Sequence, residues 1–385
     1  MVRGIYNGII VTPKGEIKDK VLYFDDKILA IEDDGFMQVE EKIDAGGKYI
    51  IPGLVDIHIH GYHGEDISDG SEEGLRIMAK GILENGVSSF LPTTMTVPWD
   101  EIVAAFELTK SMMPESQTPE FIGAEILSVH AEGPYVNPKR KGAQADTNIL
   151  PPDASRMLPY KDIIKKITLA PEMPGGIECI KEITENSDIR VSLGHTDAGY
   201  DTIVEAVKAG ATHITHLFNA MTGLNHREPG VVGAALTEDV VCELIADCFH
   251  IHPGLFSLVY KAKKDKLVLI TDCTRAGGLE DGEYTLGGQP IFVKGVECRL
   301  ADGTIAGSVL RLNHAAKNLY ENTDIPLYEA INAASLYPAR AIGVEGNKGS
   351  LDIGKDADIA IMDASFNIYN TFVRGIEKFS KGAQQ

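Results

Sequence analysis

The sequence predicts an α/β fold: a (β/α)8 barrel of the TIM type with a small β-sandwich domain formed by both chain termini. In the middle of the chain, apolar strand candidates alternate with amphipathic helix candidates, which favours a parallel sheet covered by helices. Both ends instead consist of short strand candidates broken by Gly, Pro and Asp. Several apolar runs end on a histidine or a carboxylate, and in such a barrel these strand ends converge at one mouth.

The terminal regions show no helical period. The N-terminal strand candidates are GIIVTP (8–13), KVLYFDDKILAIED (20–33) and KYIIP (48–52), and the segment 349–375 has the same character. Two β-rich ends can pair into one small domain. We therefore expect a β-sandwich domain over 1–51 and 345–385, and a barrel of about 250 residues or more within 52–344.

Between the ends, amphipathic spacing predicts helices within 71–86, 98–113, 200–210 and 311–323. The segment 266–290 holds five glycines after Asp272 and is expected to form an active-site loop.

Composition restricts the possible partners. The 385 residues include 36 Lys and Arg against 56 Asp and Glu, a formal net charge of −20, which opposes binding to nucleic acid or an anionic membrane surface. An anionic substrate must then be held by local cations. The five cysteines contain no CxxC pair, and no signal peptide or membrane-spanning run is evident. These features predict a cytoplasmic protein.

The candidate metal-binding residues lie at the ends of the apolar runs. In IPGLVDIHIHG (51–61), residues two apart share a strand face, so His58 and His60 point the same way. Each residue alone is compatible with an ordinary core or loop position, and Asp272 with a helix cap. Together they predict a divalent metal site for zinc or iron, of the open catalytic type that hydrolases use. The candidate residues are His58, His60, Glu132, His195, His216 and Asp272.

A second cluster lies in HLFNAMTGLNHREPG (216–230). Arg227, with His226 and Asn219, is a candidate for binding a phosphate, because guanidinium donates two hydrogen bonds to it. The alternative for Arg227 is a surface salt bridge. His250, near another strand end, either contacts substrate or is structural.

The motifs PGLVDIHIHG, HAEGPY, GHTDA, THLFNAM, HREPG and GTIAGS, in this order, resemble those of the N-acetylglucosamine-6-phosphate deacetylases of the amidohydrolase superfamily. The resemblance covers nearly the whole chain. It implies hydrolysis of the acetamide of N-acetyl-D-glucosamine 6-phosphate to D-glucosamine 6-phosphate and acetate. A metal-bound water would attack the amide, with Asp272 as general base and then acid.

The resemblance also assigns residues. Glu132, His195 and His216 match the principal metal ligands. In related dimers an arginine of HREPG reaches the neighbouring subunit, which implies a homodimer in which Arg227 acts in trans. The matching substrate-binding positions are Ala143, Gln144, Asn219, Ala220, His226, Arg227, Asp247, His250, Ile305, Ala306 and Gly307.

Some positions depart from the family pattern. Some members lack the HxH pair and bind one metal, whereas this chain keeps His58 and His60, so either one or two ions are expected. Gln144 stands where some members have a carbonyl-polarising histidine, and Cys248 and Cys273 also differ from the common motifs.

Three alternatives stay open. A deacetylase for N-acetylgalactosamine 6-phosphate would differ only in the sugar C4 epimer. A cyclic-amide hydrolase would usually carry a carboxylated lysine, where this chain has Glu132. A non-catalytic barrel used for binding would have no need of its metal ligands.

Overall fold

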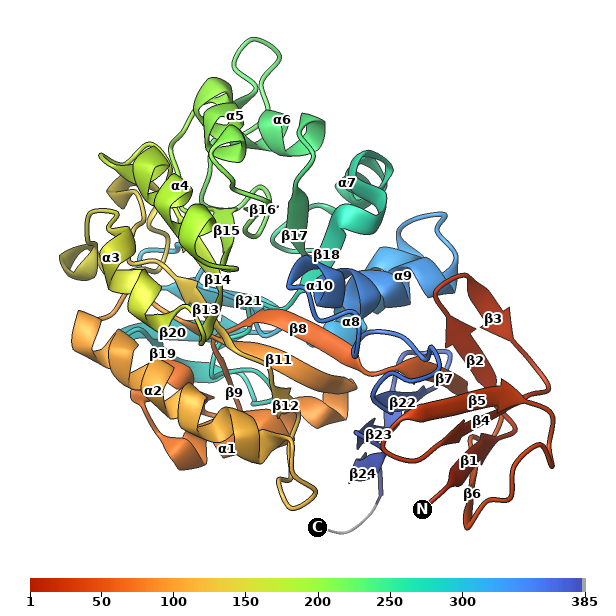
Figure 1. Ribbon diagram of the computed structural model, residues 1–385. Coiled ribbons are helices and arrows are strands. Elements are labelled where there is room, and N and C mark those ends of the chain that lie inside the picture. Colours follow the sequence, from red (N-terminus) through yellow and green to blue (C-terminus); the bar gives the residue numbers. More distant parts are fainter. Residues whose placement is uncertain (383–385) are drawn as a thin grey trace.

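The computed structural model describes residues 1–382, and its centre is a parallel β-barrel (Figure 1). The barrel strands follow one another in chain order, and β12 and β13 are two pieces of one strand that both pair with β11. They are β8 (Leu54–Ile59), β11 (Val87–Thr94), β12 (Glu125–Ile126), β13 (Val129–Glu132), β14 (Ile164–Leu169), β15 (Arg190–Leu193), β16 (His213–Ile214), β17 (Val241–Ile245) and β18 (Leu267–Ile270).

Residues just beyond β18 close the barrel against β8. The amide of Asp272 donates to the carbonyl of His58 at 2.9 Å, and the amide of His60 donates to the carbonyl of Cys273 at 2.9 Å. The side chain of Thr271 also donates to the carboxylate of Asp56 at 2.6 Å. The closing seam therefore brings the first and last barrel strands together at the mouth, where the candidate metal ligands lie.

Helices surround the barrel (Figure 1). All four predicted helical segments contain one, and Ser71 caps α1 by accepting a hydrogen bond from the amide of Gly74 at 3.0 Å. The helices are α1 (Glu72–Gly81), α2 (Trp99–Ser116), α3 (Ala154–Met157), α4 (Gly176–Asn186), α5 (Tyr200–Lys208), α6 (Gly230–Thr237), α7 (Phe256–Lys263), α8 (Leu312–Glu321), α9 (Leu327–Ala334) and α10 (Leu336–Ala341). No helix within residues 1–382 has both the length and the apolar character to cross a membrane.

The chain termini form a β-sandwich beside the barrel, where red N-terminal and blue C-terminal strands lie together in Figure 1. One sheet has the order β5-β4-β1-β6, and the other has the order β24-β23-β22-β7-β2-β3. Their bounds are β1 (Arg3–Tyr6), β2 (Ile9–Thr12), β3 (Gly15–Ile17), β4 (Val21–Phe24), β5 (Ile28–Glu32), β6 (Glu41–Asp44), β7 (Tyr49–Pro52), β22 (Ile359–Met362), β23 (Ile368–Val373) and β24 (Ile376–Ser380).

The second sheet joins the two ends of the chain. Strand β7 pairs in parallel with β2 and antiparallel with β22, so N-terminal and C-terminal strands share one hydrogen-bonded ladder. Buried Leu22, Ile50 and Phe372 belong to one apolar core cluster of this domain. The predicted fold class is thus confirmed. The exact division into 1–51 with 345–385 and 52–344 stays a prediction, and residues 383–385 lie outside the described part.

The segment after Asp272 differs from the expected loop. Much of it forms an antiparallel sheet of β19 (Gly282–Leu286), β20 (Gln289–Lys294) and β21 (Glu297–Leu300). Gly287 (φ 54°) and Gly288 (φ 78°) form the two-residue turn between β19 and β20, where both central residues need positive φ. The sheet reaches the barrel mouth, because Leu286 lines a cavity there and the side-chain amide of Gln289 donates to the carbonyl of Ala143 at 2.7 Å.

Candidate metal centre and active site

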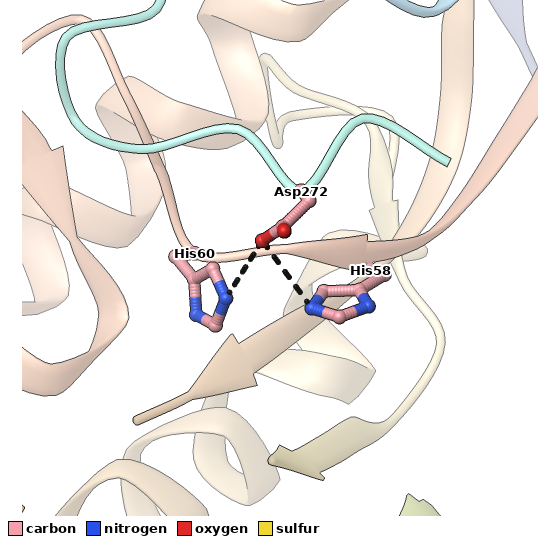
Figure 2. A group of neighbouring side chains, drawn as sticks. All are labelled: His58, His60 and Asp272. Carbon is pink, nitrogen blue, oxygen red and sulfur yellow. Dashed lines mark ion pairs between the residues drawn. The ribbon is translucent and has the colours of Figure 1, made fainter. Parts of the chain in front are cut away.

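The six predicted metal-binding side chains meet at the barrel mouth in two groups. One contains His58, His60 and Asp272, as Figure 2 shows, and the other contains Glu132, His195 and His216. Within each group, one potential ligand atom per residue lies within 4.8 Å of the others, and all six residues are buried. The ends of five separate strands thus build one site.

The backbone is unusual where three of these strands end. His195 (φ 49°), His216 (φ 30°) and Asp272 (φ 51°) all have positive φ, a conformation that residues other than glycine rarely adopt. Each follows its strand within two residues. Such backbone strain concentrates at functional sites, where surrounding structure holds it in place.

Glu132 lies at the centre of both groups. Its Oε1 is 3.3 Å from Nε2 of His58, 3.3 Å from Nε2 of His195 and 3.2 Å from Nε2 of His216. Its Oε2 is 3.3 Å from Nε2 of His60. Asp272 completes the set, with Oδ1 at 3.1 Å from Nε2 of His60 and 3.5 Å from Nε2 of His58.

The other ring nitrogens show which atoms carry hydrogen. Nδ1 of His60 is 3.0 Å from the carbonyl oxygen of Thr93, and Nδ1 of His195 is 2.9 Å from the carbonyl oxygen of Arg140. A carbonyl only accepts hydrogen bonds, so Nδ1 is the donor in each ring, and in a neutral ring Nε2 then has a lone pair.

Lone pairs and carboxylate oxygens therefore face one another at the centre of the site. Among residues 1–382, the buried atoms without a hydrogen-bond partner include Nε2 of His58 and Oε1 of Glu132. Crowded acceptors of this kind favour a positive charge between them, either protons on the histidine rings or a bound metal ion. The donor set, imidazole and carboxylate without thiolate, suits a divalent metal ion at each group, and the residues fit the family's implied cofactor.

Both carboxylates are ionised at neutral pH. Burial raises the pKa of Asp272, but without a metal ion the positive charge of His58 and the hydrogen bond and charge of His60 outweigh it, and the pKa falls to about 2. Burial also opposes ionisation of Glu132, yet His58 and His195 hold its pKa well below the usual range. Asp272 is therefore able to accept a proton.

Above the two groups lies a cavity of about 500 Å³. It is lined by His60, Glu132, His195, His216 and Asp272, and seven of the predicted substrate-binding residues also line it. These are Ala143, Gln144, Asn219, Ala220, His250, Ile305 and Gly307.

The other four predicted substrate-binding residues lie elsewhere. Ala306 is fully buried, and Asp247 lies behind His250, whose Nδ1 is 2.6 Å from Oδ2 of Asp247. His226 and Arg227 are exposed and do not line the cavity of their own chain. The structure thus brings most, but not all, of the predicted residues together.

Gln144 is held by two hydrogen bonds. Its Nε2 donates to Oε2 of Glu132 at 2.8 Å, and its Oε1 accepts from the amide of Thr96 at 2.6 Å. The side-chain amide therefore orients Glu132 and has its oxygen occupied by the backbone.

Sequence reasoning missed three groups around the site. Lys139, Arg140 and Lys141 line the cavity, and their signal was three consecutive cations in a strongly acidic chain. Lys166 and Glu243 lie below the metal-binding groups, fully buried within β14 and β17. Their signal was a charged residue inside an apolar strand. His130, on β13, is also fully buried, with Nε2 at 2.7 Å from Oγ1 of Thr168.

Residues 49–378 match the model of the amidohydrolase family. The chain belongs to this family. It is 42% identical over 343 residues to the N-acetylglucosamine-6-phosphate deacetylase of Bacillus subtilis (strain 168), covering 87% of this chain and 86% of the relative. It is 36% identical to the N-acetylgalactosamine-6-phosphate deacetylase of Escherichia coli O157:H7, covering 95% of this chain and 96% of the relative.

The crystal structure of the N-acetylglucosamine-6-phosphate deacetylase from Pasteurella multocida superposes on this amidohydrolase with a TM-score of 0.92 at 32% identity. The match covers 98% of this chain and 99% of the other. Together these relatives confirm the predicted barrel fold and the predicted reaction class, a deacetylase of the amidohydrolase family. The cyclic-amide and non-catalytic alternatives gain no support from them.

Proposed function

We propose that this amidohydrolase hydrolyses the acetamide of N-acetyl-D-glucosamine 6-phosphate to D-glucosamine 6-phosphate and acetate. The observation that carries the proposal is the ionised Asp272, which belongs to one of two candidate metal-binding groups at the floor of a cavity. A relative at 42% identity is named for this reaction, which supports the choice of substrate.

We propose a divalent ion, zinc or iron, at Glu132, His195 and His216, and a second at His58, His60 and Asp272. Bound divalent cations lower the pKa of water and polarise a carbonyl group. Asp272 then accepts the proton of the attacking water on its carboxylate and returns it to the departing amine nitrogen.

His250 is the proposed contact of the acetamide oxygen, and it donates there in its doubly protonated form, because its Nδ1 already donates to the carboxylate of Asp247. Its Nδ1 is held 2.6 Å from Asp247, which leaves Nε2 as the ring nitrogen for the cavity that His250 lines. The side-chain oxygen and one amide hydrogen of Gln144 already have partners at Thr96 and Glu132. His250 is thus better placed than Gln144 to stabilise the oxyanion.

The phosphate needs cations in an acidic protein. We propose that Arg227 and His226 of a second copy bind it, which makes the active unit a homodimer. Both residues are exposed, so their side chains are free to reach a neighbouring copy. Lys139 and Lys141 add positive charge at the cavity wall of the same chain. All five cysteines are free thiols, which favours a cytoplasmic location.

The galacto epimer is the second candidate substrate, because a relative at 36% identity is named for N-acetylgalactosamine 6-phosphate. The two substrates differ only at the C4 hydroxyl.

The test is acetate release by the enzyme purified with added divalent metal. Three substrates are compared: N-acetylglucosamine 6-phosphate, its galacto epimer and unphosphorylated N-acetylglucosamine, with Asp272→Asn as the control. Activity that is strongest on the gluco phosphate and lost in the control is the expected result. Preference for the galacto epimer would reassign the substrate, and inactivity on all three would contradict the proposal.

A further inference from the structure

A buried chain of three side chains lies beneath the metal-binding groups. Nδ1 of His58 is 3.1 Å from Oε2 of Glu243, and the other oxygen of Glu243 contacts the ammonium group of Lys166. All three residues are fully buried. Oε2 of Glu243 also accepts a hydrogen bond from the backbone amide of His216 at 3.3 Å. One carboxylate thus contacts a residue of each metal-binding group.

The contact with Glu243 determines which ring nitrogen of His58 carries the hydrogen. An ionised carboxylate only accepts hydrogen bonds, so Nδ1 of His58 must donate to Glu243. The lone pair of the neutral ring is then at Nε2, which is 3.3 Å from Oε1 of Glu132 and 3.5 Å from Oδ1 of Asp272. The opposite tautomer would place a hydrogen at the ligand atom.

We propose that Glu243, held in place by Lys166, is a positioning residue that fixes the tautomer of His58 and so makes the His58, His60 and Asp272 group able to bind an ion. This inference rests on the proposed function, which places a metal ion there, and adds two residues to it. The group of Glu132, His195 and His216 depends less on Glu243. The tautomer of His195 is set by a different contact, because its Nδ1 lies 2.9 Å from the carbonyl oxygen of Arg140.

Glu243→Gln tests the tautomer with almost no change of shape. The Lys166 ammonium group has only donors, so it takes the amide oxygen of the new side chain. The amide NH2 group then faces Nδ1 of His58, which must become an acceptor, and the hydrogen moves to Nε2. That ring can no longer bind a metal ion. Loss of a partner behind a metal-binding histidine typically weakens affinity about 10- to 100-fold.

The experiment measures bound zinc per chain, and zinc affinity by chelator competition, in the purified full-length enzyme. We expect two ions in the wild type and one in Glu243→Gln, with the second bound at least about tenfold more weakly. Glu125→Gln is the matched control, since Glu125 forms another buried pair, 2.5 Å from Nζ of Lys348, outside the metal-binding groups. It should keep both ions.

A double variant distinguishes two possible causes of weaker metal binding in Glu243→Gln, a changed tautomer of His58 and a general loss of structure. Adding Lys166→Met to Glu243→Gln removes the cation that binds the side-chain oxygen of the new glutamine. That oxygen can then turn toward Nδ1 of His58 and the backbone amide of His216. We expect the second ion to return. A folded double variant that binds no better than Glu243→Gln would overturn the proposal, as would two tightly bound ions in Glu243→Gln or a single ion in the wild type.

Nitrogen-15 NMR of the metal-free wild type gives a readout that needs no variant. The proposal requires hydrogen on Nδ1 of His58, and a ring with hydrogen on Nε2 and none on Nδ1 would overturn it. Ion count and tautomer do not depend on the substrate, so they are separate from the acetate assay that tests the proposed function.

Discussion

Asp272 combines two properties at the scale of a single residue. It belongs to a candidate metal-binding group with His58 and His60, and it lines the cavity where substrate would lie. Burial favours its neutral form, but the two histidines keep the carboxylate ionised. The same carboxylate can therefore face an ion and receive a proton.

Replacing Asp272 with Asn should lower kcat by about 10²- to 10⁴-fold, because an amide cannot take the proton of the attacking water. The ion at Glu132, His195 and His216 should remain, since Asp272 is not in that group. Acetate release and metal analysis of the same preparation check both parts. Asp265→Asn, at a half-exposed ion pair with Arg340, is the control. Near-normal turnover in Asp272→Asn would rule out this role.

His213 should make stability depend on pH. Burial, with help from the charges of Lys166 and Arg190, lowers the pKa of His213 to about 3, against 6.5 when exposed. As the pH falls below 6.5 the unfolded chain takes up a proton that the folded protein does not, so stability falls. From pH 7 to pH 5, this residue alone should remove about 2 kcal/mol, at about 1.4 kcal/mol per pKa unit.

The measurement is urea unfolding of the wild type and His213→Gln at pH 7 and pH 5. The variant should lose about 2 kcal/mol less between the two pH values. His252→Gln, at an exposed histidine, should behave like the wild type. An equal loss in the wild type and His213→Gln would refute the assignment.

The sequence predicts residues at strand ends better than residues inside strands. Glu132, His195 and Asp272 each follow an apolar run, and a barrel has to bring such positions together. Lys166 and Glu243 lie inside strands, where a charged residue signals burial but not its partner. Their pairing depends on which strands lie opposite each other across the barrel, and local spacing does not contain that information.

At the scale of elements, one ammonium group links the barrel to the β-sandwich. Lys348 is buried 2.5 Å from Glu125 on β12 and 2.9 Å from both Asp356 and Asp358, which precede β22. Burial lowers the pKa of Lys348, but Asp358 and Glu125 outweigh it and raise the pKa above its ordinary value. The charge is thus retained across the usual pH range.

Lys348→Met should destabilise the protein by about 3–5 kcal/mol, because it leaves buried carboxylates without their main cation. The change in unfolding free energy is measured in guanidinium chloride. Lys80→Met, at an exposed position of α1, should change it by less than about 0.5 kcal/mol. A similar small change in Lys348→Met would show that the cluster is not structurally important.

Element types were predictable where periodicity was strong. The segments expected to form α1, α2, α5 and α8 do so, and the apolar runs that end at candidate ligands form barrel strands. The sheet of β19, β20 and β21 differs from the predicted loop, because glycines are common both in loops and in the tight turns of hairpins. The two glycines at Gly287 and Gly288, flanked by the paired residues Leu286 and Gln289, are the sequence signal of a hairpin here.

At the scale of the whole molecule, the proposed phosphate site draws on residues of two chains. The cavity holds the cation-binding groups, His250 and the 139–141 cations, whereas Arg227 lies exposed outside it. In a symmetric dimer, a surface loop of each subunit can reach the cavity of the other subunit. The proposed homodimer would use this arrangement, and it predicts a pattern of activity that no monomer can produce.

Co-expression of two inactive variants tests the pattern. Arg227→Gln keeps Asp272, and Asp272→Asn keeps Arg227. If Arg227 acts across the dimer, a mixed dimer has one site with both residues and one site with neither. Random pairing makes half of the dimers mixed, so about a quarter of all sites should be active, where each variant alone shows little activity. If Arg227 serves its own chain, no site in any dimer has both residues, and activity stays at the level of the separate variants.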